Sequence, residues 1–517
     1  MMPKIKNQVQ LIVYPDSFGG NLKQLHQILN KYFHKALGGV HILPFYPSSS
    51  DRGFSPLTHM EVDSHFGSWQ DIKAIGRDYN LVCDLMVNHV SSHSYRFQDF
   101  LRHGSKAKYA NCFITAEKFS RRINSWPRHK LMRWLLAILE MIANFYRRYD
   151  FIFHKDGVNR FCLKKIYRPR PGDPFVPFRF ADGSLKYVWC TFSPDQVDLN
   201  IKSPAVRRKF KRNIAQLAAV GAKILRLDAV GYVAKKRGTS SFLIKETYHF
   251  IRWLGRQAHQ QGVAVLPEVH YHFKTQLKLA RLPEVDYVYD FALPILILHT
   301  LFSGNPERLL NWLKIRPTNC VTVLDTHDGI GIVDGEGLLT AEEIKKTTHL
   351  LKLHGAHEAW RALNGGQERE LYQMDTTYFS ALGENEDAYI AARAIQLFLP
   401  GIPQIYYVGL LAGSNDYQLY KKTKISRDLN RHNYSCQEIE ANLNRPVIKR
   451  LLRLMIWRNQ HPAFTGQFEV KRPREEILLL RWQKGRNHIQ AEINLKTYVV
   501  YLLWRDPRTG LEKKEKV

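Results

Sequence analysis

Eight short apolar runs recur along the chain, and each one ends abruptly in polar or turn-forming residues. Runs of this length, made mostly of branched and aromatic side chains, are typical of strands buried on both faces of a parallel sheet. Amphipathic helical patterns separate most of them, as at residues 205–222 and 241–261. In chain order the runs are QLIVYP, GVHILPF, NLVCDLMVNH, AKILRLDAV, VAVLPEVH, VDYVYDFAL, CVTVLDTHD and IPQIYYVG. This alternation of strand and helix predicts an α/β protein built on a (β/α)8 TIM barrel.

Two intervals between the predicted strands are too long for a single crossover helix. They follow the third and the seventh strand, and long insertions on the catalytic face of a barrel usually act as lids or substrate loops. Near residue 466 the pattern changes to short alternating runs, which indicate a small all-β domain. We therefore predict barrel segments at 1–90, 203–328 and 387–466, lid insertions at 91–202 and 329–386, and a C-terminal β domain at 467–517.

One stretch of the first insertion, residues 131–146, is apolar except for Arg133, Glu140 and Asn144. A membrane-spanning helix needs about 20 apolar residues, so this stretch is too short to span a bilayer. We expect a helix packed on the barrel or against a second subunit of a homodimer. Shallow attachment to a membrane surface is the alternative.

The composition fits a globular enzyme. The chain has 517 residues, of which 44% are hydrophobic, enough for a full barrel with insertions and a small further domain. Six cysteines are scattered without metal-ligand spacing, which argues against a zinc site and a disulfide framework. The first residues do not have the organisation of a signal peptide, so we expect a reduced, cytoplasmic protein.

The charge is strongly positive, because 76 Lys and Arg residues against 47 Asp and Glu residues give +29. Such an excess can attract nucleic acid, anionic lipid or acidic metabolites. The basic residues are nevertheless spread along the whole chain, and no recognised nucleic-acid motif is present. We therefore expect a solvated basic surface, with no nucleic-acid partner and no membrane partner.

Three carboxylates end three of the predicted strands: Asp228, Glu268 and Asp328. A barrel of parallel strands carries its chemistry at their C-terminal ends. A single Asp after a strand is usually a helix cap, but three acids in succession, each near a His or Arg, are not explained that way. They are the parts of a retaining glycosidase-type site, namely a nucleophile, a proton donor and a third anion beside the oxocarbenium-like centre.

Other polar residues are expected at the same rim. Arg226 precedes Asp228 by two residues and so shares its face of the strand, where a guanidinium keeps a carboxylate ionised. The second predicted strand leads to Asp51 and Phe54, and the third leads to His89.

The sequence around these residues resembles glycoside hydrolase family 13, the α-amylase superfamily, and within it sucrose phosphorylases and related α-glucoside phosphorylases. The resemblance covers about residues 9–466. It rests on the runs DRGFSP, RLDAVGY, PEVH, YDFALP, NCVTVLDTHDGIG, AARAIQLFLPGIPQIYYVGLLAG and RDLNRH. These unbroken motifs are much more specific than three acids alone.

The resemblance implies roles for individual residues. It makes Asp228 the nucleophile, Glu268 the acid/base and Asp328 the transition-state stabiliser. It implies no metal and no organic cofactor. It also implies a closed subsite for a glucosyl ring: Asp51, His89, Arg226, His327 and Arg431 hold the hydroxyls, and Phe54, Phe192, Gln196 and Tyr232 line the walls.

The acceptor depends on residues around the covalent glucosyl-enzyme, because hydrolysis and phosphorolysis use the same carboxylates. Arg170, His270 and Tyr372 could hold phosphate and match the residues that do so in sucrose phosphorylases. Two neighbouring residues shape the leaving-group side. Glu370 keeps a carboxylate where the family tends to have Asp, and Arg369 replaces a usual apolar residue, which would suit an anionic leaving group.

The sequence therefore predicts a retaining phosphorylase that converts sucrose and phosphate to α-glucose 1-phosphate and fructose. Three related donors stay open: glucosylglycerate, glucosylglycerol and sucrose 6-phosphate. A retaining α-glucosidase or transglucosylase is the alternative enzyme. A catalytically silent binding barrel and a nucleic-acid-binding protein are alternatives of other classes, which the intact acids and the dispersed charge argue against.

Overall fold

The computed structural model describes residues 5–120, 163, 165–170, 172–363, 368–506 and 509–517. The apolar stretch 131–146 lies outside these residues. None of the helices in the described part is long and apolar enough to cross a membrane.

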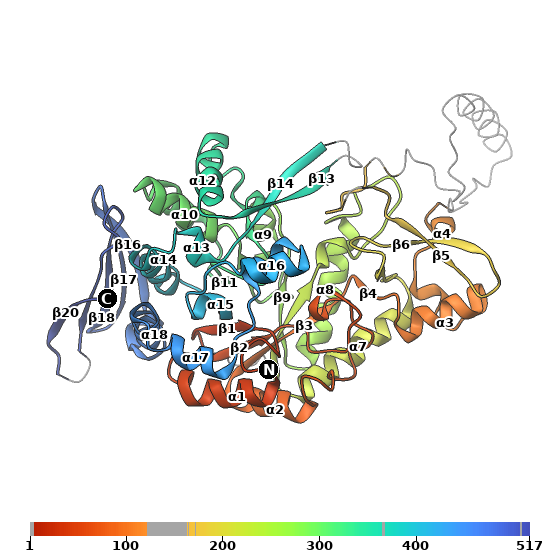
Figure 1. The fold of residues 1–517 in the computed structure, drawn as a ribbon, viewed down its shortest axis with the longest axis horizontal. Coiled ribbons are helices and arrows are strands. Elements are labelled where there is room, and N and C mark those ends of the chain that lie inside the picture. The colour runs from red at the N-terminus through yellow and green to blue at the C-terminus, as the bar shows by residue number, and fades with distance from the viewer. Residues whose placement is uncertain (1–4, 121–162, 164, 171, 364–367, 507–508) are drawn as a thin grey trace.

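All eight predicted strands form one parallel sheet, which confirms the barrel (Figure 1). The sheet has the order β10-β11-β15-β1-β2-β3-β8-β9. Between its first and last strands, the carbonyl of Val265 in β9 accepts hydrogen bonds of 3.1 and 3.2 Å from Asp286 and Tyr287, just before β10, so the barrel is nearly closed. The strands are β1 (Gln10–Val13), β2 (Gly39–Ile42), β3 (Asn80–Met86), β8 (Ala222–Asp228), β9 (Ala264–Pro267), β10 (Val288–Asp290), β11 (Cys320–Thr322) and β15 (Ile402–Tyr406).

Helices between the strands cover the outside of the barrel (Figure 1). Helix α8 illustrates their pattern, since Phe250, Ile251 and Leu254 recur at helical spacing and are all buried. The main covering helices are α1 (Leu22–Ile28), α2 (Trp69–Asp78), α7 (Pro204–Ala219), α8 (Lys245–Gln260), α9 (Lys274–Ala280), α10 (Leu293–Ser303), α11 (Glu307–Ile315), α14 (Glu386–Phe398) and α18 (Pro446–Gln460). Shorter helices are α15 (Tyr407–Leu410), α16 (Tyr417–Thr423) and α17 (Cys436–Asn442).

Two groups of elements interrupt the barrel after its third and seventh strands. After β3 come β4 (His89–Ser91), α3 (Tyr95–His103), α4 (Ala116–Ser120), β5 (Phe175–Arg179), β6 (Leu185–Trp189) and β7 (Gln196–Asp198). After β11 come β12 (Ile330–Gly331), α12 (Ala341–Leu353), β13 (His357–Leu363), β14 (Glu368–Asp375) and α13 (Tyr378–Ala381). Strand β7 pairs with β4, and β14 pairs with both β12 and β13. That these segments act as lids stays a prediction.

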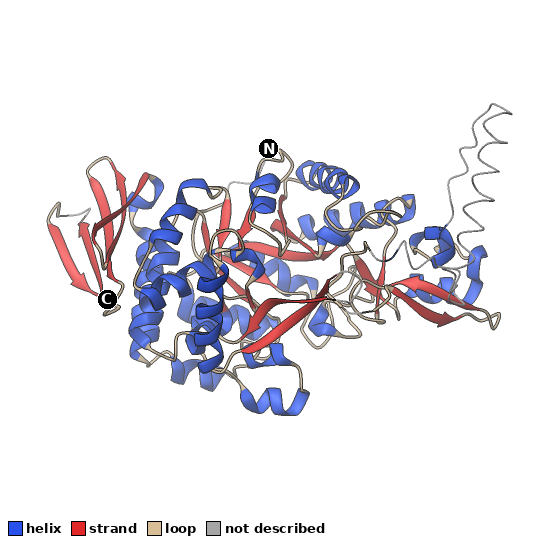
Figure 2. Cartoon of the chain, turned by 90° about the horizontal axis from the view of Figure 1, so that it is seen from above, coloured by secondary structure: helices blue, strands red, loops and turns tan. Residues whose placement is uncertain are grey.

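The C-terminal β domain is confirmed as a five-stranded antiparallel sheet at one end of the molecule (Figure 2). Its strands are β16 (Gln467–Arg474), β17 (Ile477–Lys484), β18 (Asn487–Asn494), β19 (Val500–Arg505) and β20 (Glu512–Lys516). Alternate residues such as Leu478, Leu480 and Trp482 are buried, as the alternating sequence predicts. The indole of Trp482 donates a 2.6 Å hydrogen bond to the carbonyl of Phe398 in α14, which ties the sheet to the barrel.

Candidate active site

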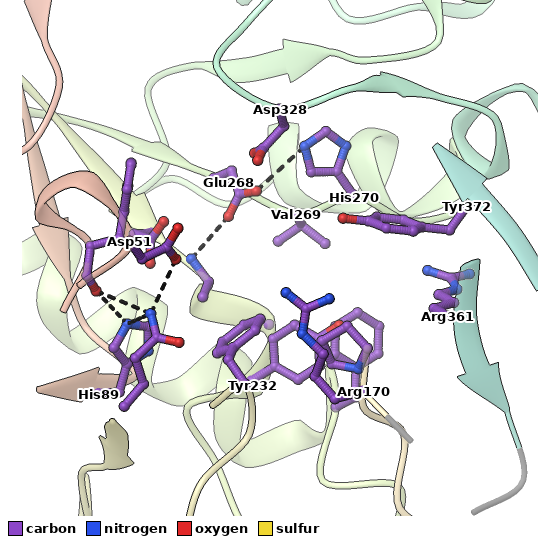
Figure 3. Close-up of a pocket in the computed structure, with 18 of the residues that line it drawn as sticks. Asp51, His89, Arg170, Tyr232, Glu268, Val269, His270, Asp328, Arg361 and Tyr372 are labelled. Carbon is purple, nitrogen blue, oxygen red and sulfur yellow. Dashed lines mark hydrogen bonds and ion pairs between the residues drawn. The ribbon is translucent and has the colours of Figure 1, made fainter. Parts of the chain in front are cut away.

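A cavity of about 120 Å³ lies where the C-terminal ends of the barrel strands meet the inserted segments (Figure 3). The structure brings most of the predicted residues to its wall. They are Asp51, Phe54, His89, Arg170, Phe192, Gln196, Asp228, Tyr232, Glu268, His270, His327, Asp328 and Tyr372. Four predicted residues do not line the cavity, namely Arg226, Arg369, Glu370 and Arg431.

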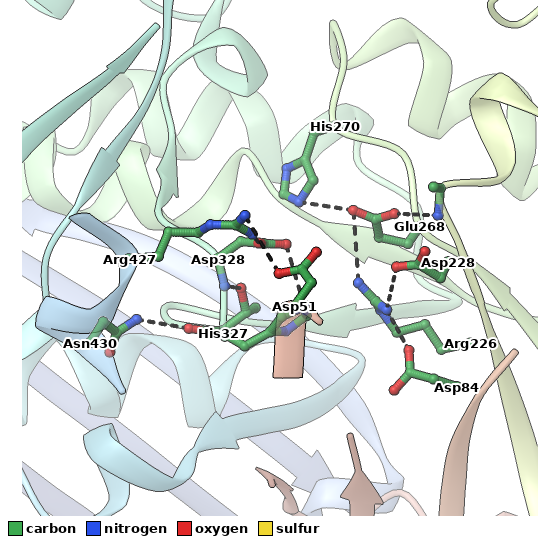
Figure 4. A network of polar contacts seen from close by, with 12 residues as sticks. Asp51, Asp84, Arg226, Asp228, Glu268, His270, His327, Asp328, Arg427 and Asn430 are labelled. Carbon is green, nitrogen blue, oxygen red and sulfur yellow. Dashed lines mark hydrogen bonds and ion pairs between the residues drawn. The ribbon is translucent and has the colours of Figure 1, made fainter. Parts of the chain in front are cut away.

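Arg226 lies beneath the cavity floor and holds the carboxylates together (Figure 4). It is 3% exposed, pairs with Asp84, and lies 3.3 Å from Asp228 and 3.8 Å from Glu268. Burial raises the pKa of Asp84, but Arg226 and His41 outweigh it and hold the pKa at about 2. Arg226 thus contacts three acids and is absent from the cavity wall, and its predicted contact with substrate hydroxyls stays a prediction.

Asp228 ends β8 and is buried beside Glu268. Burial raises the pKa of Asp228, and although Arg226 lowers it, Glu268 adds to the rise. Arg226 therefore favours the ionised form of Asp228 against the effects of burial and of Glu268, and its role of keeping Asp228 ionised stays a prediction. Two interacting carboxyl groups lose their protons as a pair, and a retaining mechanism needs one protonated and one ionised group.

Glu268 follows β9 and is fixed against the strand that carries Asp228. One of its oxygens accepts a 2.9 Å hydrogen bond from the backbone N–H of Ala229, the residue after Asp228. The other oxygen lies 3.4 Å from Nε2 of His270. The carboxyl group of Glu268 is therefore held in one orientation between the backbone after Asp228 and the imidazole of His270.

His270 is set between two acids. Its Nδ1 lies 3.2 Å from Asp334, and its ring stacks on Phe291 with the centroids 3.8 Å apart. Burial lowers the pKa of His270, but Asp334 and Glu268 outweigh it and raise the pKa to about 9. The imidazole therefore carries a positive charge near neutral pH.

Among the described residues, one group could present ligand atoms to a metal ion. One atom each of Glu268, His270 and Asp328 lies within 4.8 Å of the others. The two acids beside His270 raise its pKa, so without an ion the three side chains form an ionic cluster. The absence of a metal cofactor stays a prediction.

Asp328 is paired with Arg427, which sequence reasoning missed. The two side chains are 2.9 Å apart, and Arg427 also lies 3.8 Å from Asp51 (Figure 4). Burial raises the pKa of Asp328, but His327, Arg427 and His270 outweigh it and hold the pKa below its usual range. Asp328 is therefore an anion at any working pH.

Arg431 was predicted to hold a hydroxyl of the glucosyl ring, but it is Arg427, four residues earlier, that lines the cavity. The guanidinium of Arg431 donates hydrogen bonds of 3.2 and 3.0 Å to the carbonyl of His327 and lies behind the cavity. Both arginines belong to the motif RDLNRH, and a short 3-10 helix, Ser426–Asn430, turns the first one inward. The sequence indicates that the motif belongs to the site, but it does not indicate which of the two arginines reaches the cavity.

One corner of the cavity is closed by aromatic rings and amides. The rings of Phe54 and His327 stack with centroids 4.8 Å apart and an interplanar angle of 7°. Gln196 donates to Asp51 at 3.3 Å and to the carbonyl of Phe54 at 3.4 Å. Flat rings with a few fixed polar groups are suited to holding a sugar ring.

Arg170, Tyr372 and Arg361 lie together on one side of the cavity, opposite Asp51 and His89 (Figure 3). Arg361, on β13, was not predicted, since nothing in its sequence neighbourhood indicates a site. It is 5% exposed on its side chain, pairs with Glu370, and lies over the ring of Tyr167 at 5.0 Å. Tyr372 is skipped in the register between β13 and β14, so it lies in a β-bulge, a device that re-aims side chains near active sites.

Two residues predicted for the leaving-group side, Arg369 and Glu370, lie away from the cavity wall. Arg369 is exposed and lies outside the cavity wall, while Glu370 is engaged by Arg361 behind it. Arg361 lines the cavity in their place, and its charge is compensated by Glu370.

Comparison with known proteins places this geometry in a family. The family model "Alpha amylase, catalytic domain" matches residues 12–279. A glucosylglycerol phosphorylase of Marinobacter adhaerens is 40% identical over 98% of both chains. A sucrose phosphorylase of Streptococcus mutans is 40% identical over 99% of this chain and 100% of its own. The crystal structure of sucrose 6F-phosphate phosphorylase from Thermoanaerobacter thermosaccharolyticum superposes with a TM-score of 0.90, at 40% identity, and covers 100% of this chain and 99% of that one.

Proposed function

We infer the function from the fact that the chain belongs to the α-amylase family, glycoside hydrolase family 13, and has phosphorylases among its full-length relatives. We propose that it is a retaining α-glucosyl phosphorylase. The observation that carries the proposal is that Arg170, His270 and Tyr372 share one cavity with Asp228, Glu268 and Asp328.

The reaction proceeds by double displacement. Glu268 donates a proton to the glycosidic oxygen while Asp228 attacks the anomeric carbon, so the leaving group departs and a covalent glucosyl-enzyme forms. Phosphate then attacks the same carbon from the face that the leaving group vacated, and Asp228 is released. Two inversions give α-glucose 1-phosphate with retained configuration. Asp328 and Arg427 flank the centre where positive charge develops.

The phosphate site is supported by charge. His270 carries a positive charge near neutral pH, and Arg170 lines the same cavity. Burial raises the pKa of Tyr372, which keeps its phenol a neutral hydrogen-bond donor. A guanidinium, an imidazolium and a phenol together match the oxygens of a phosphate dianion.

The donor we propose is sucrose. Because Arg361 is neutralised by Glu370 and Arg369 lies outside the cavity, an uncompensated cation for an anionic leaving group is not found at these positions. This supports a neutral leaving group, fructose first and glycerol second. Glucosylglycerate and sucrose 6-phosphate carry anionic leaving groups and are the less favoured donors.

A donor screen tests the proposal. Sucrose, glucosylglycerol, glucosylglycerate and sucrose 6-phosphate are each incubated with the protein, with and without phosphate, and α-glucose 1-phosphate and free glucose are measured. We expect α-glucose 1-phosphate from sucrose, and only when phosphate is present. Glucose release at the same rate without phosphate would make the protein a hydrolase, and glucosyl transfer to sugars would make it a transglucosylase.

The remaining expectations are proposals of the same kind. The inserted segments act as lids, since their residues Phe192, Gln196, Arg361 and Tyr372 line the cavity. The protein works in the cytoplasm on sucrose and phosphate, without a nucleic-acid or membrane partner. A homodimer is the assembly to test by light scattering, and metal analysis of active protein tests the absence of a cofactor.

A further inference from the structure

We propose that Asp195 is a positioning residue for this reaction, because it holds in place the turn that carries Asp51 and Phe54. Asp195 itself does not line the cavity. The proposal rests on the proposed function only in assuming that Asp51 contacts the glucosyl ring.

The turn at Asp51 has a strained backbone. Asp51 and Arg52 have φ angles of 54° and 48°, and Gly53 follows with 101°. Side chains with a β-carbon rarely adopt this left-handed region, and two such residues in succession persist only where the surroundings hold them. At Gly53 a β-carbon would meet the carbonyl oxygen of Pro44 at 2.4 Å, so the glycine is required.

One side of the turn is anchored by Arg52. Its guanidinium donates to Ser17 at 2.8 Å and to Asn433 at 2.9 Å, and it lies over the ring of Tyr14 at 4.3 Å. This anchor fixes Arg52 against the barrel but leaves the serines on either side of the turn to be held from elsewhere.

Asp195 holds the other side. One of its carboxylate oxygens accepts hydrogen bonds from the hydroxyls of Ser49, Ser50 and Ser55, at 2.5, 2.5 and 2.7 Å. These serines lie before and after the strained residues, so a single carboxylate closes the turn at both ends. Hydrogen bonds to an anion are stronger than those between neutral groups, which suits a carboxylate to this task.

Asp195 also ties the turn to the residue that follows β4 and to its own segment. Its second oxygen accepts from the hydroxyl of Ser92 at 2.9 Å, and its carbonyl accepts from the backbone N–H of Ser92 at 2.7 Å. The next residue, Gln196, donates to Asp51 at 3.3 Å. Asp195 therefore joins the strained turn to β4. Its neighbour in sequence, Gln196, contacts Asp51 directly.

The charge of Asp195 is present under all working conditions. Burial raises the pKa of its carboxyl group, but the hydroxyls of Ser49, Ser50, Ser55 and Ser92 outweigh it and lower the pKa. The side chain is 23% exposed and has a His93 nitrogen at 3.9 Å as its ion-pair partner.

The test compares Asp195→Asn and Asp195→Ala with a matched control, Asp182→Asn. Asp182 also accepts hydrogen bonds from a serine, Ser184, but does so in the exposed turn between β5 and β6. The readout is fluoride release from α-glucosyl fluoride, which needs the glucosyl subsite and not phosphate. We expect kcat/KM to fall by roughly tenfold in Asp195→Asn and a hundredfold in Asp195→Ala, since small displacements of a positioning group cost this much. The Asp182→Asn control keeps its wild-type rate.

A double-mutant cycle with Asp51→Asn separates positioning from general destabilisation. If Asp195 acts through Asp51, then Asp195→Asn lowers the rate little once Asp51 has been replaced. If the fold-losses of the two single variants multiply in the double variant, Asp195 does not act through Asp51 and the proposal is overturned. A wild-type rate in a folded Asp195→Asn protein overturns it as well. Because water takes the glucosyl group in this assay and phosphate is not needed, a failure of the phosphorylase assignment leaves this test intact.

Discussion

The arginines in and around the cavity differ in whether a carboxylate compensates their charge. Arg226, Arg361 and Arg427 are each paired with a carboxylate, namely those of Asp84, Glu370 and Asp328. Within the described part of the chain, no ion pair is recorded for Arg170, which lines the same cavity. A guanidinium whose charge is not already compensated is the one that an incoming dianion gains most from contacting.

Replacing Arg170 by Ala is therefore expected to weaken the use of phosphate. Loss of one charge-assisted contact costs about 1.5–3 kcal/mol, which is roughly ten- to hundredfold in kcat/KM for phosphate. Hydrolysis of the same donor, measured without phosphate, changes much less. Arg369→Ala is the matched control, because Arg369 is an exposed arginine outside the cavity wall. Equal losses in the two variants would remove Arg170 from the phosphate site.

Lys209 gives a prediction about pH and stability. Burial lowers the pKa of this lysine in α7 to about 7, with Arg96 nearby and His59 as a 3.2 Å neighbour. An unfolded lysine has a pKa of about 10.4, so between pH 7 and 10 the unfolded chain binds a proton that the folded protein does not. The stability of the wild type therefore rises with pH in this window.

Lys209→Met removes this proton linkage. We expect its free energy of unfolding at pH 7 to exceed that of the wild type by roughly 1–4 kcal/mol. The difference should shrink as the pH rises from 7 toward 10, because the wild type gains stability over this window while the variant, which lacks the titrating lysine, does not. Urea unfolding at several pH values measures it, and a difference that does not change with pH would contradict the lowered pKa.

At the level of elements, the β13–β14 hairpin carries Tyr372 to the cavity and is braced by the Arg361–Glu370 pair. Arg361→Met leaves the half-buried carboxylate of Glu370 without its partner. This lowers the stability of the hairpin and leaves an uncompensated negative charge near the phosphate. We expect phosphorolysis to slow by about tenfold, since uncompensated charges near a site cost on the order of 1–2 kcal/mol. The double variant Arg361→Met, Glu370→Gln should recover part of the rate. A double variant slower than the single one would show that Arg361 acts on the substrate and not through Glu370.

The sequence predicts an element well when the residues that specify it lie within the element itself. The barrel strands were predictable because each one is a buried run with its own polar end. The seventh run was predicted to extend to Asp328, but the strand ends at Thr322. Asp325 leaves the sheet there to pair with Arg393, which is buried in α14 and far away in sequence.

The site residues that sequence reasoning missed are likewise positioned by segments distant in sequence. The three acids follow strands and could be placed, whereas Arg361 and Arg427 reach the cavity from the hairpin and from a 3-10 helix. Their positions depend on how those segments fold back over the barrel. No local periodicity encodes that, so the motif alone could not choose Arg427 over Arg431.

At the level of the whole molecule, the net charge of +29 acts on any anionic substrate. A positive surface raises the local phosphate concentration, and salt screens this attraction because the Debye length falls from about 10 Å at 0.1 M to 3 Å at 1 M. We expect the apparent KM for phosphate to rise several-fold between about 0.02 and 0.5 M salt. The KM for sucrose, which is neutral, should stay nearly constant and serves as the control. Parallel changes in both constants would indicate an effect of salt on the fold.

The pairing of the first barrel strand affects how the chain folds during its synthesis on the ribosome. β1 lies between β2 and β15, with Gln10 opposite Gln404, so one of its two neighbours is encoded nearly four hundred residues later. A ribosome that adds about 5–20 residues per second needs roughly 20–80 s to cover this distance. During that time one edge of β1 is an open template for the wrong partner. We therefore expect the early helices or a chaperone to protect this edge from wrong pairing until β15 has been synthesised.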